Sequence, residues 1–243
     1  MSETTQRHRL KLEILPQPDL TTCGPTCLQA VYGYFGDVLP LKRVIAEIPQ
    51  LTDGGTLAVI LGLNALKRGY QAKLLTYDLQ VFDPTWFSDS RAVLVRKLRE
   101  QMSAKKRPKL KAATQAYLEF LDLGGEIRMK DLTNELIRKF LNRSVPILTG
   151  LSATYLYQEE RELPDSTPDD IRGHPTGHFV VLCGYDRSKR EVLIADPLHP
   201  NPLAKRQLYS VSIDRVKCAI LLGVMTYDAN LLIIEPHFKP SRS

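Results

Sequence analysis

The sequence lacks any apolar run near the roughly 18 residues that a membrane-spanning helix needs. Its polar start, MSETTQRHRL, also lacks the apolar core of a secretory signal. Only four cysteines occur in 243 residues, and Cys183 and Cys218 lie inside apolar runs, so no disulfide framework is indicated. Internal repeats and low-complexity segments are absent as well. We therefore expect a soluble, cytoplasmic protein in a reducing compartment.

The charge is only moderately one-sided, with 33 Lys and Arg against 27 Asp and Glu and a net charge of +6 at pH 7. Much of the excess lies within residues 91–111, where five basic residues cluster between two helical patterns: Lys105, Lys106, Arg107, Lys109 and Lys111. No aromatic residues interleave with these charges, as a platform for stacking bases would require. Solvated helix ends therefore explain the cluster better than nucleic acid does, and an acidic peptide stays open as a partner.

The chain is long enough, at 43% hydrophobic residues, to form one large domain or two small ones. Hydrophobic periodicity mixes helices and strands, which predicts the α+β class. Helices are predicted over about 23–35, 41–48, 57–68 and 130–141 and from Ser212, and strands over about 71–77, 145–151, 178–185, 191–196, 204–211 and 231–234. Residues 84–123 form two helical patterns broken near Pro108, and we interpret them as a helical insertion within one domain, 1–243.

The most informative local pattern is the stretch from Gln17 to Cys27, QPDLTTCGPTC, which runs into an apolar helical pattern. A cysteine in the first turn lies at the positive end of the helix dipole, which favours the nucleophilic thiolate. This pattern indicates Cys23 as a nucleophile. The amide of Gln17 is a neutral donor suited to an oxyanion beside the sulfur. Cys27, one turn later on the same face, is interpreted as a packing residue.

The clearest hairpin signal joins 178–185 to 191–196 through a polar turn. If the hairpin is symmetric about Arg187, His178 faces Asp196, and directly paired residues have Cβ atoms about 4.5–5.5 Å apart. The carboxylate could then hold one imidazole nitrogen while the other faces the thiolate. Nucleophile, base and orienter would form one site.

Two alternatives compete with this site. His174 is a rival base, although the polar loop of 158–177 gives it little support. A zinc site could use four residues whose spacing is formally allowed, namely Cys23, Cys27, His174 and His178. Zinc would leave Gln17 and Asp196 unexplained, so we expect neither a metal nor a cofactor.

Read together, Gln17-x5-Cys23-Gly-Pro, His178-Phe-Val-Val-Leu and Asp196-Pro197 make the chain resemble the papain-like cysteine peptidases. The likeness is to the bacteriocin-leader-processing (double-glycine) peptidases and their stand-alone relatives, over roughly 11–80 and 130–235. It implies a helical lobe, bearing the cysteine at its first helix, packed on an antiparallel sheet. Transporter helices and a nucleotide-binding motif, often fused to such peptidases, are not found, and the basic insertion lies outside the family pattern.

The resemblance implies that Cys23 is the nucleophile, His178 the general base and acid, Asp196 its orienter and Gln17 the oxyanion donor. We expect thiol-dependent cleavage of a peptide or protein substrate. An acyltransferase or transpeptidase that uses the same thioester, and a non-catalytic peptide-binding module, remain as alternatives. The acidic loop of 158–177 is expected to border the cleft or to lie free in solvent.

Overall fold

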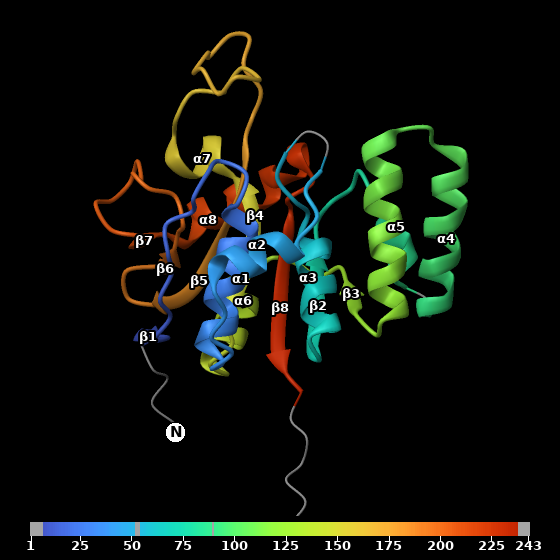
Figure 1. Cartoon of the computed structure of the whole chain (residues 1–243), viewed down its shortest axis with the longest axis horizontal. Coiled ribbons are helices and arrows are strands. Elements are labelled where there is room, and N and C mark those ends of the chain that lie inside the picture. The colour runs from blue at the N-terminus through green and yellow to red at the C-terminus, as the bar shows by residue number, and fades with distance from the viewer. Residues whose placement is uncertain (1–6, 52–53, 89, 238–243) are drawn as a thin grey trace, which may run out of the picture.

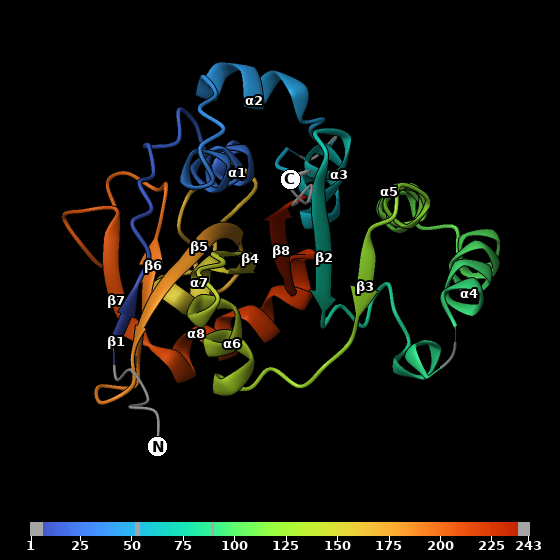
Figure 2. The same cartoon turned by 90° about the horizontal axis from the view of Figure 1, so that it is seen from below.

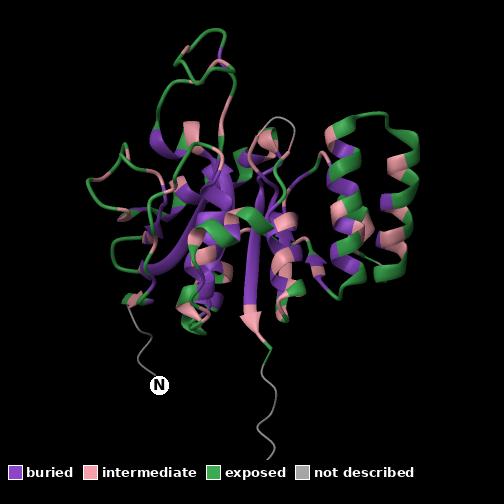
Figure 3. Cartoon of the chain, viewed as in Figure 1, coloured by how far each residue is buried: buried purple, intermediate pink, exposed green. Residues whose placement is uncertain are grey.

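The protein is described here by a computed structural model, which covers residues 7–51, 54–88 and 90–237. Within them, an eight-stranded sheet runs in the order β3-β2-β8-β4-β5-β6-β7, and β1 pairs with β5 (Figure 1). The strands are β1 (Arg7–Arg9), β2 (Tyr70–Thr76), β3 (Glu126–Arg128), β4 (Ile147–Ser152), β5 (Gly177–Asp186), β6 (Glu191–Ala195), β7 (Leu208–Ser212) and β8 (Asn230–Pro236). The sheet forms the centre of the molecule, and its middle strands carry its most buried residues (Figure 3).

Helices cover both faces of the sheet, with α1 and α3 on one side and α6 and α8 on the other (Figure 2). The helices are α1 (Cys23–Tyr34), α2 (Leu41–Glu47), α3 (Ala58–Lys67), α4 (Arg91–Ala104), α5 (Pro108–Asp122), α6 (Asn134–Asn142), α7 (Ala153–Tyr157) and α8 (Ile213–Leu222), with the short 3₁₀ turns η1 (Pro84–Phe87) and η2 (Gly223–Thr226). Because both faces are covered, β4 is buried along its whole length and β5 nearly so.

The predicted helices and strands are confirmed to within a few residues, but β1, β3 and α7 were missed. The sheet is antiparallel as expected, except that β2 and β3 at its edge pair in parallel. Parallel neighbours need a long crossover connection. Here that connection contains α4 and α5, which stand beside the sheet at its β3 edge (Figure 1).

The predicted register of the β5–β6 hairpin is wrong. Asp186 pairs with Glu191 across a loop of 187–190, and a bulge between Leu182 and Gly184 then shifts the pairing so that Val181 faces Ala195. Symmetry about Arg187 had assumed a shorter turn and no bulge. His178 and Asp196 are consequently not a cross-strand pair.

The α4–α5 hairpin packs through α5. The ring of Phe120 is fully buried and lies so close to α3 that a Cβ on Gly62 would be 2.7 Å from it. The chain leaves α5 through Gly124, whose φ of +92° favours glycine. In the part of the chain that the structure describes, no helix is long and apolar enough to cross a membrane.

Candidate active site

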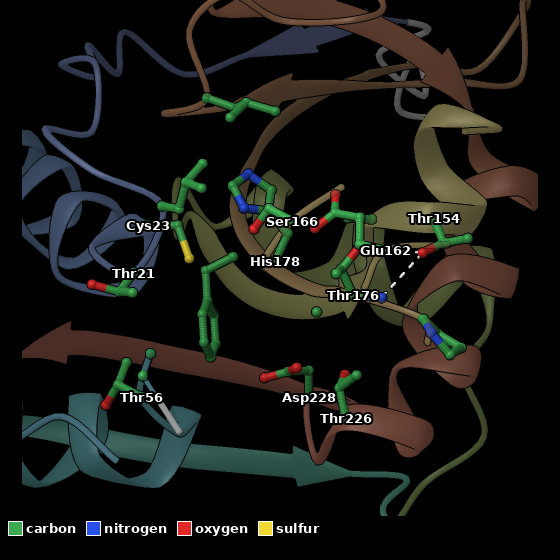
Figure 4. Close-up of a pocket in the computed structure, with 18 of the residues that line it drawn as sticks. Thr21, Cys23, Thr56, Thr154, Glu162, Ser166, Thr176, His178, Thr226 and Asp228 are labelled. Carbon is green, nitrogen blue, oxygen red and sulfur yellow. Dashed lines mark hydrogen bonds between the residues drawn. The ribbon is translucent and has the colours of Figure 1, made fainter. Parts of the chain in front are cut away.

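A cleft of about 530 Å³ opens at the N-terminal end of α1, within the range of roughly 300–1,000 Å³ typical of ligand sites. Its walls come from the segment before α1, residues 54–57 before α3, helix α7, the loop of 158–177 and the segment before β8. Cys23 and His178 lie beside each other in this cleft, with Asp228 on another wall (Figure 4). The loop of 158–177 therefore borders the cleft, which was one of the two expectations for it.

Cys23 is the first residue of α1 and is 8% exposed. The helix start is pressed against the segment before α3, since a Cβ on Gly24 would lie 2.7 Å from the methyl group of Thr56. Thr26 donates its hydroxyl to the carbonyl of Thr22 at 2.8 Å, which ties the first turn together. Because residue 24 is glycine, the start of α1 can pack closely against the segment before α3 while the thiol of Cys23 faces the cleft.

His178 lies at the start of β5 and connects Cys23 to Asp196. Its Nε2 is 2.9 Å from Oδ1 of Asp196, which leaves Nδ1 for the thiol. Burial lowers the pKa of His178, but the charge and hydrogen bond of Asp196, aided by Cys23, outweigh burial and raise it to about 10. The imidazole is thus poised to hold a proton, and the structure brings three of the expected site residues together.

Asp196 has no solvent exposure, and both of its carboxylate oxygens accept hydrogen bonds. The donors to Oδ1 are His178 and the backbone N–H of Leu198, the latter at 2.9 Å, and the donors to Oδ2 are Tyr157 at 2.8 Å, Asn201 at 2.9 Å and Tyr209 at 2.5 Å. Burial raises the pKa of Asp196, but the charge of His178 and these bonds lower it overall. The carboxylate is therefore held ionised and in one orientation.

Sequence reasoning missed the three side chains that hold Oδ2. Tyr209 lies in a strand that was expected, but Tyr157 belongs to the missed helix α7 and Asn201 to the loop after β6. No local pattern marks them. Only the fold brings segments so distant in sequence to one carboxylate.

Gln17 lines the same cleft, and its backbone N–H donates to the carbonyl of Pro197 at 2.8 Å. That bond ties Gln17 to the residue that follows Asp196. One amide N–H of Gln17 goes to the carbonyl of Asp19 at 2.9 Å, and its Oε1 is buried without a hydrogen-bond partner. Since the amide nitrogen carries two hydrogens, a second donor is left.

The remaining candidates do not join the site. The thiol of Cys27 is fully buried and donates to the carbonyl of Phe179 at 3.2 Å, which agrees with a packing role. His174 lies in the loop, where its backbone pairs with Glu162. Within the described residues, no group of three or more His, Cys, Asp or Glu could hold a metal ion.

Charged residues line the rest of the cleft, and most of them were not singled out from the sequence. Glu159, Glu160, Glu162 and Asp228 line it, and α5 contributes Lys109. An acidic peptide is therefore not favoured as the partner, because carboxylates in the lining would repel it.

Comparisons with known proteins agree with the fold. A family model described as the Peptidase_C39 like family matches residues 9–217. A structure described as a C39-like peptidase from Bacillus anthracis is similar with a TM-score of 0.54 at 15% identity, covering 97% of this chain and 100% of that one. The expected papain-like α+β fold is thereby confirmed.

Two further structures match at lower similarity. One is a double glycine motif protease from an AMS/PCAT transporter in complex with the leader peptide, with a TM-score of 0.45, 16% identity and 94% coverage of each chain. The other is the peptidase domain of Streptococcus ComA, a bi-functional ABC transporter, with a TM-score of 0.44, 15% identity and coverage of 93% of this chain and 99% of that one. No curated protein matches the sequence.

Proposed function

Because the chain belongs to the Peptidase_C39 like family, we propose that it is a cysteine peptidase that hydrolyses a peptide or related amide bond through an acyl-enzyme on Cys23. One observation carries the proposal. The Nε2 atom of His178 lies 2.9 Å from Oδ1 of the buried, ionised Asp196, and its Nδ1 atom is left to interact with Cys23. Nucleophile, base and orienter thus share one end of a cleft, as covalent catalysis requires.

In the first half of the reaction, His178 holds the proton that leaves Cys23, and the thiolate attacks the substrate carbonyl carbon. The oxyanion that forms is stabilised by the backbone N–H of Cys23 and by the free amide N–H of Gln17. When the tetrahedral adduct collapses, the C–N bond breaks. His178 then gives its proton to the leaving amine, and a thioester remains on Cys23.

In the second half, water attacks the thioester carbonyl while His178 accepts one of its protons. Collapse of this second adduct expels the thiolate and releases a free acid. Asp196 stays ionised throughout and stabilises the imidazolium. Its two tyrosine donors and Asn201 keep the carboxylate fixed while His178 changes protonation.

The test is to capture the acyl-enzyme from a peptide-rich cell extract and identify the acyl group by mass spectrometry. We expect an adduct on Cys23 and free-acid products in solution. Cys23→Ala should give neither. Cys218→Ala removes an exposed cysteine outside the cleft, serves as the matched control, and should behave like the unmodified protein. Wild-type turnover by Cys23→Ala would refute the proposal.

A further inference from the structure

Asp228 is a buried carboxylate in the cleft that the proposed mechanism does not use. It lies between η2 and β8, is 6% exposed, and lines the same cleft as Cys23 and His178. Figure 4 shows Asp228 and Thr226 together on one wall. Burying a carboxylate costs hydration free energy, so a buried carboxylate needs compensating interactions in its surroundings.

The carboxylate of Asp228 lies against the backbone just before the base. A Cβ on Gly177 would overlap with Oδ2 of Asp228 and would lie 2.7 Å from Oγ1 of Thr226. Asp228 therefore fills the space that a side chain on Gly177 would occupy, one residue before His178. A substrate group that reaches Asp228 must belong to a residue close to the scissile bond.

No close cation neutralises this carboxylate. Among the described residues, no Lys, Arg or His nitrogen lies within 4.0 Å of it. Burial, aided by the charge of Asp78, raises the pKa of Asp228 to about 7, and the Thr226 hydrogen bond and the charges of Lys109 and His178 only partly oppose this rise. The Lys109 ammonium lies over the ring of Tyr227, 5.1 Å from its centroid.

The charge of the surrounding wall has the same sign as Asp228. Three glutamates of the loop, Glu159, Glu160 and Glu162, line the cleft with it, against Lys109 and the protonated His178. A cationic side chain that enters the cleft would therefore be attracted by the wall and would find Asp228 as an acceptor in the lining.

We propose that Asp228 forms a specificity pocket that binds the Lys or Arg side chain of a substrate residue next to the scissile bond. The inference rests on the proposed peptidase function, since it assigns the substrate of that same cleft. Asp228 would act as the acceptor for the ammonium or guanidinium, and the glutamates would raise the local concentration of cationic peptide.

The first test needs no turnover. Cys23→Ala protein is incubated with a peptide library in which each position carries Lys, Arg or the neutral analogue norleucine, and bound peptides are identified by mass spectrometry. We expect Lys and Arg to be enriched about 10-fold or more over norleucine at a single position, as expected for a hydrogen bond to a charged group. Equal recovery of Lys, Arg and norleucine at every position would overturn the proposal, whether or not the protein cleaves peptides.

The second test uses Asp228→Asn, which keeps the size of the side chain and removes its charge. We expect the Lys-to-norleucine ratio of kcat/KM, or of affinity in the Cys23→Ala background, to fall about 10- to 100-fold. Asp214→Asn is the control, because Asp214 is a carboxylate of α8 that does not line the cleft. The ratio should be unchanged in the control. An equal loss for Lys and norleucine substrates in Asp228→Asn would indicate a merely structural carboxylate and would contradict the pocket.

Discussion

The proposed catalytic end of the cleft, at Cys23 and His178, and the α4–α5 hairpin are held by opposite kinds of interaction. At this end, five hydrogen-bond donors from four segments converge on the buried carboxylate of Asp196. The hairpin instead rests on one apolar face of α5, and within α4 the buried residues are Leu94 and Leu98. A polar network fixes geometry, whereas apolar burial mainly supplies stability. The two regions should therefore fail separately when they are perturbed.

The strongest test of this separation is Phe120→Ala. Removing a fully buried phenylalanine that packs against Gly62 should lower the free energy of unfolding by about 3–5 kcal/mol. Chemical denaturation measures the loss, and the folded fraction should keep the alkylation rate of Cys23. Leu123→Ala, at a 44% exposed position after the same helix, is the control and should change stability by less than about 0.5 kcal/mol. Loss of Cys23 reactivity in folded Phe120→Ala protein would show that the hairpin and the catalytic end are coupled.

Gln17→Ala should have the converse effect. Loss of one oxyanion donor typically reduces kcat about 100- to 1,000-fold, which is about 2.7–4 kcal/mol of activation free energy. Because the Gln17 side chain is only partly buried and its backbone bond to Pro197 remains, stability should change little. Steady-state kinetics and a denaturation curve check the two parts. Gln50→Ala, in a nearby exposed glutamine, should leave kcat unchanged, and a kcat within 5-fold of wild type for Gln17→Ala would rule out the oxyanion role.

The two regions also differ in how far the sequence predicts them. Cys23 and Gln17 lie in one short motif at a helix start, so residue types and spacing alone indicated the roles that we propose for them. His178 and Asp196 were paired correctly from a wrong register. The contact survives because Asp196 follows the end of β6, where its side chain can reach His178 without direct cross-strand pairing.

Long-range packing explains what the sequence did not predict. Tyr157, Tyr209 and Asp228 carry no local signal, since each acquires its role only when distant segments meet. The two helices of residues 84–123 were expected from periodicity, but the placement of Lys109 at the cleft depends on how the hairpin docks. That this hairpin is an insertion stays a prediction.

The protonated His178 gives the catalytic end a pH dependence that the hairpin should lack. Its folded pKa of about 10 lies above the ordinary value of 6.5. A raised histidine pKa stabilises the fold fully below the unfolded value, and that stability is lost as pH rises through the folded value. The free energy of unfolding can change by at most ~1.4 kcal/mol per pH unit for one group, so we expect it to fall by about 2 kcal/mol between pH 7 and pH 9.

Urea denaturation across that pH range measures the slope, and His178→Gln is the matched variant because it removes the titrating group and keeps a polar side chain. Identical slopes for the two proteins would mean that Asp196 does not hold His178 in its protonated form.

The smallest expected effect concerns a single donor of the Asp196 network. Tyr209→Phe removes the 2.5 Å hydrogen bond to Oδ2 and keeps the ring, while Tyr157 and Asn201 still donate to the same oxygen. A hydrogen bond to a charged group contributes about 1.5–3 kcal/mol, and with two donors left we expect a loss near 1.5 kcal/mol in the free energy of unfolding. The weaker hold on the carboxylate should also lower kcat several-fold with little change in KM. Tyr185→Phe is the control for kcat. Tyr185 lies in β5 away from the cleft, and its hydroxyl donates to Asn142 of α6. If Tyr209→Phe lost stability but kept the wild-type kcat, the network would support the fold without positioning His178. The two regions would then differ only in the type of interaction that stabilises them.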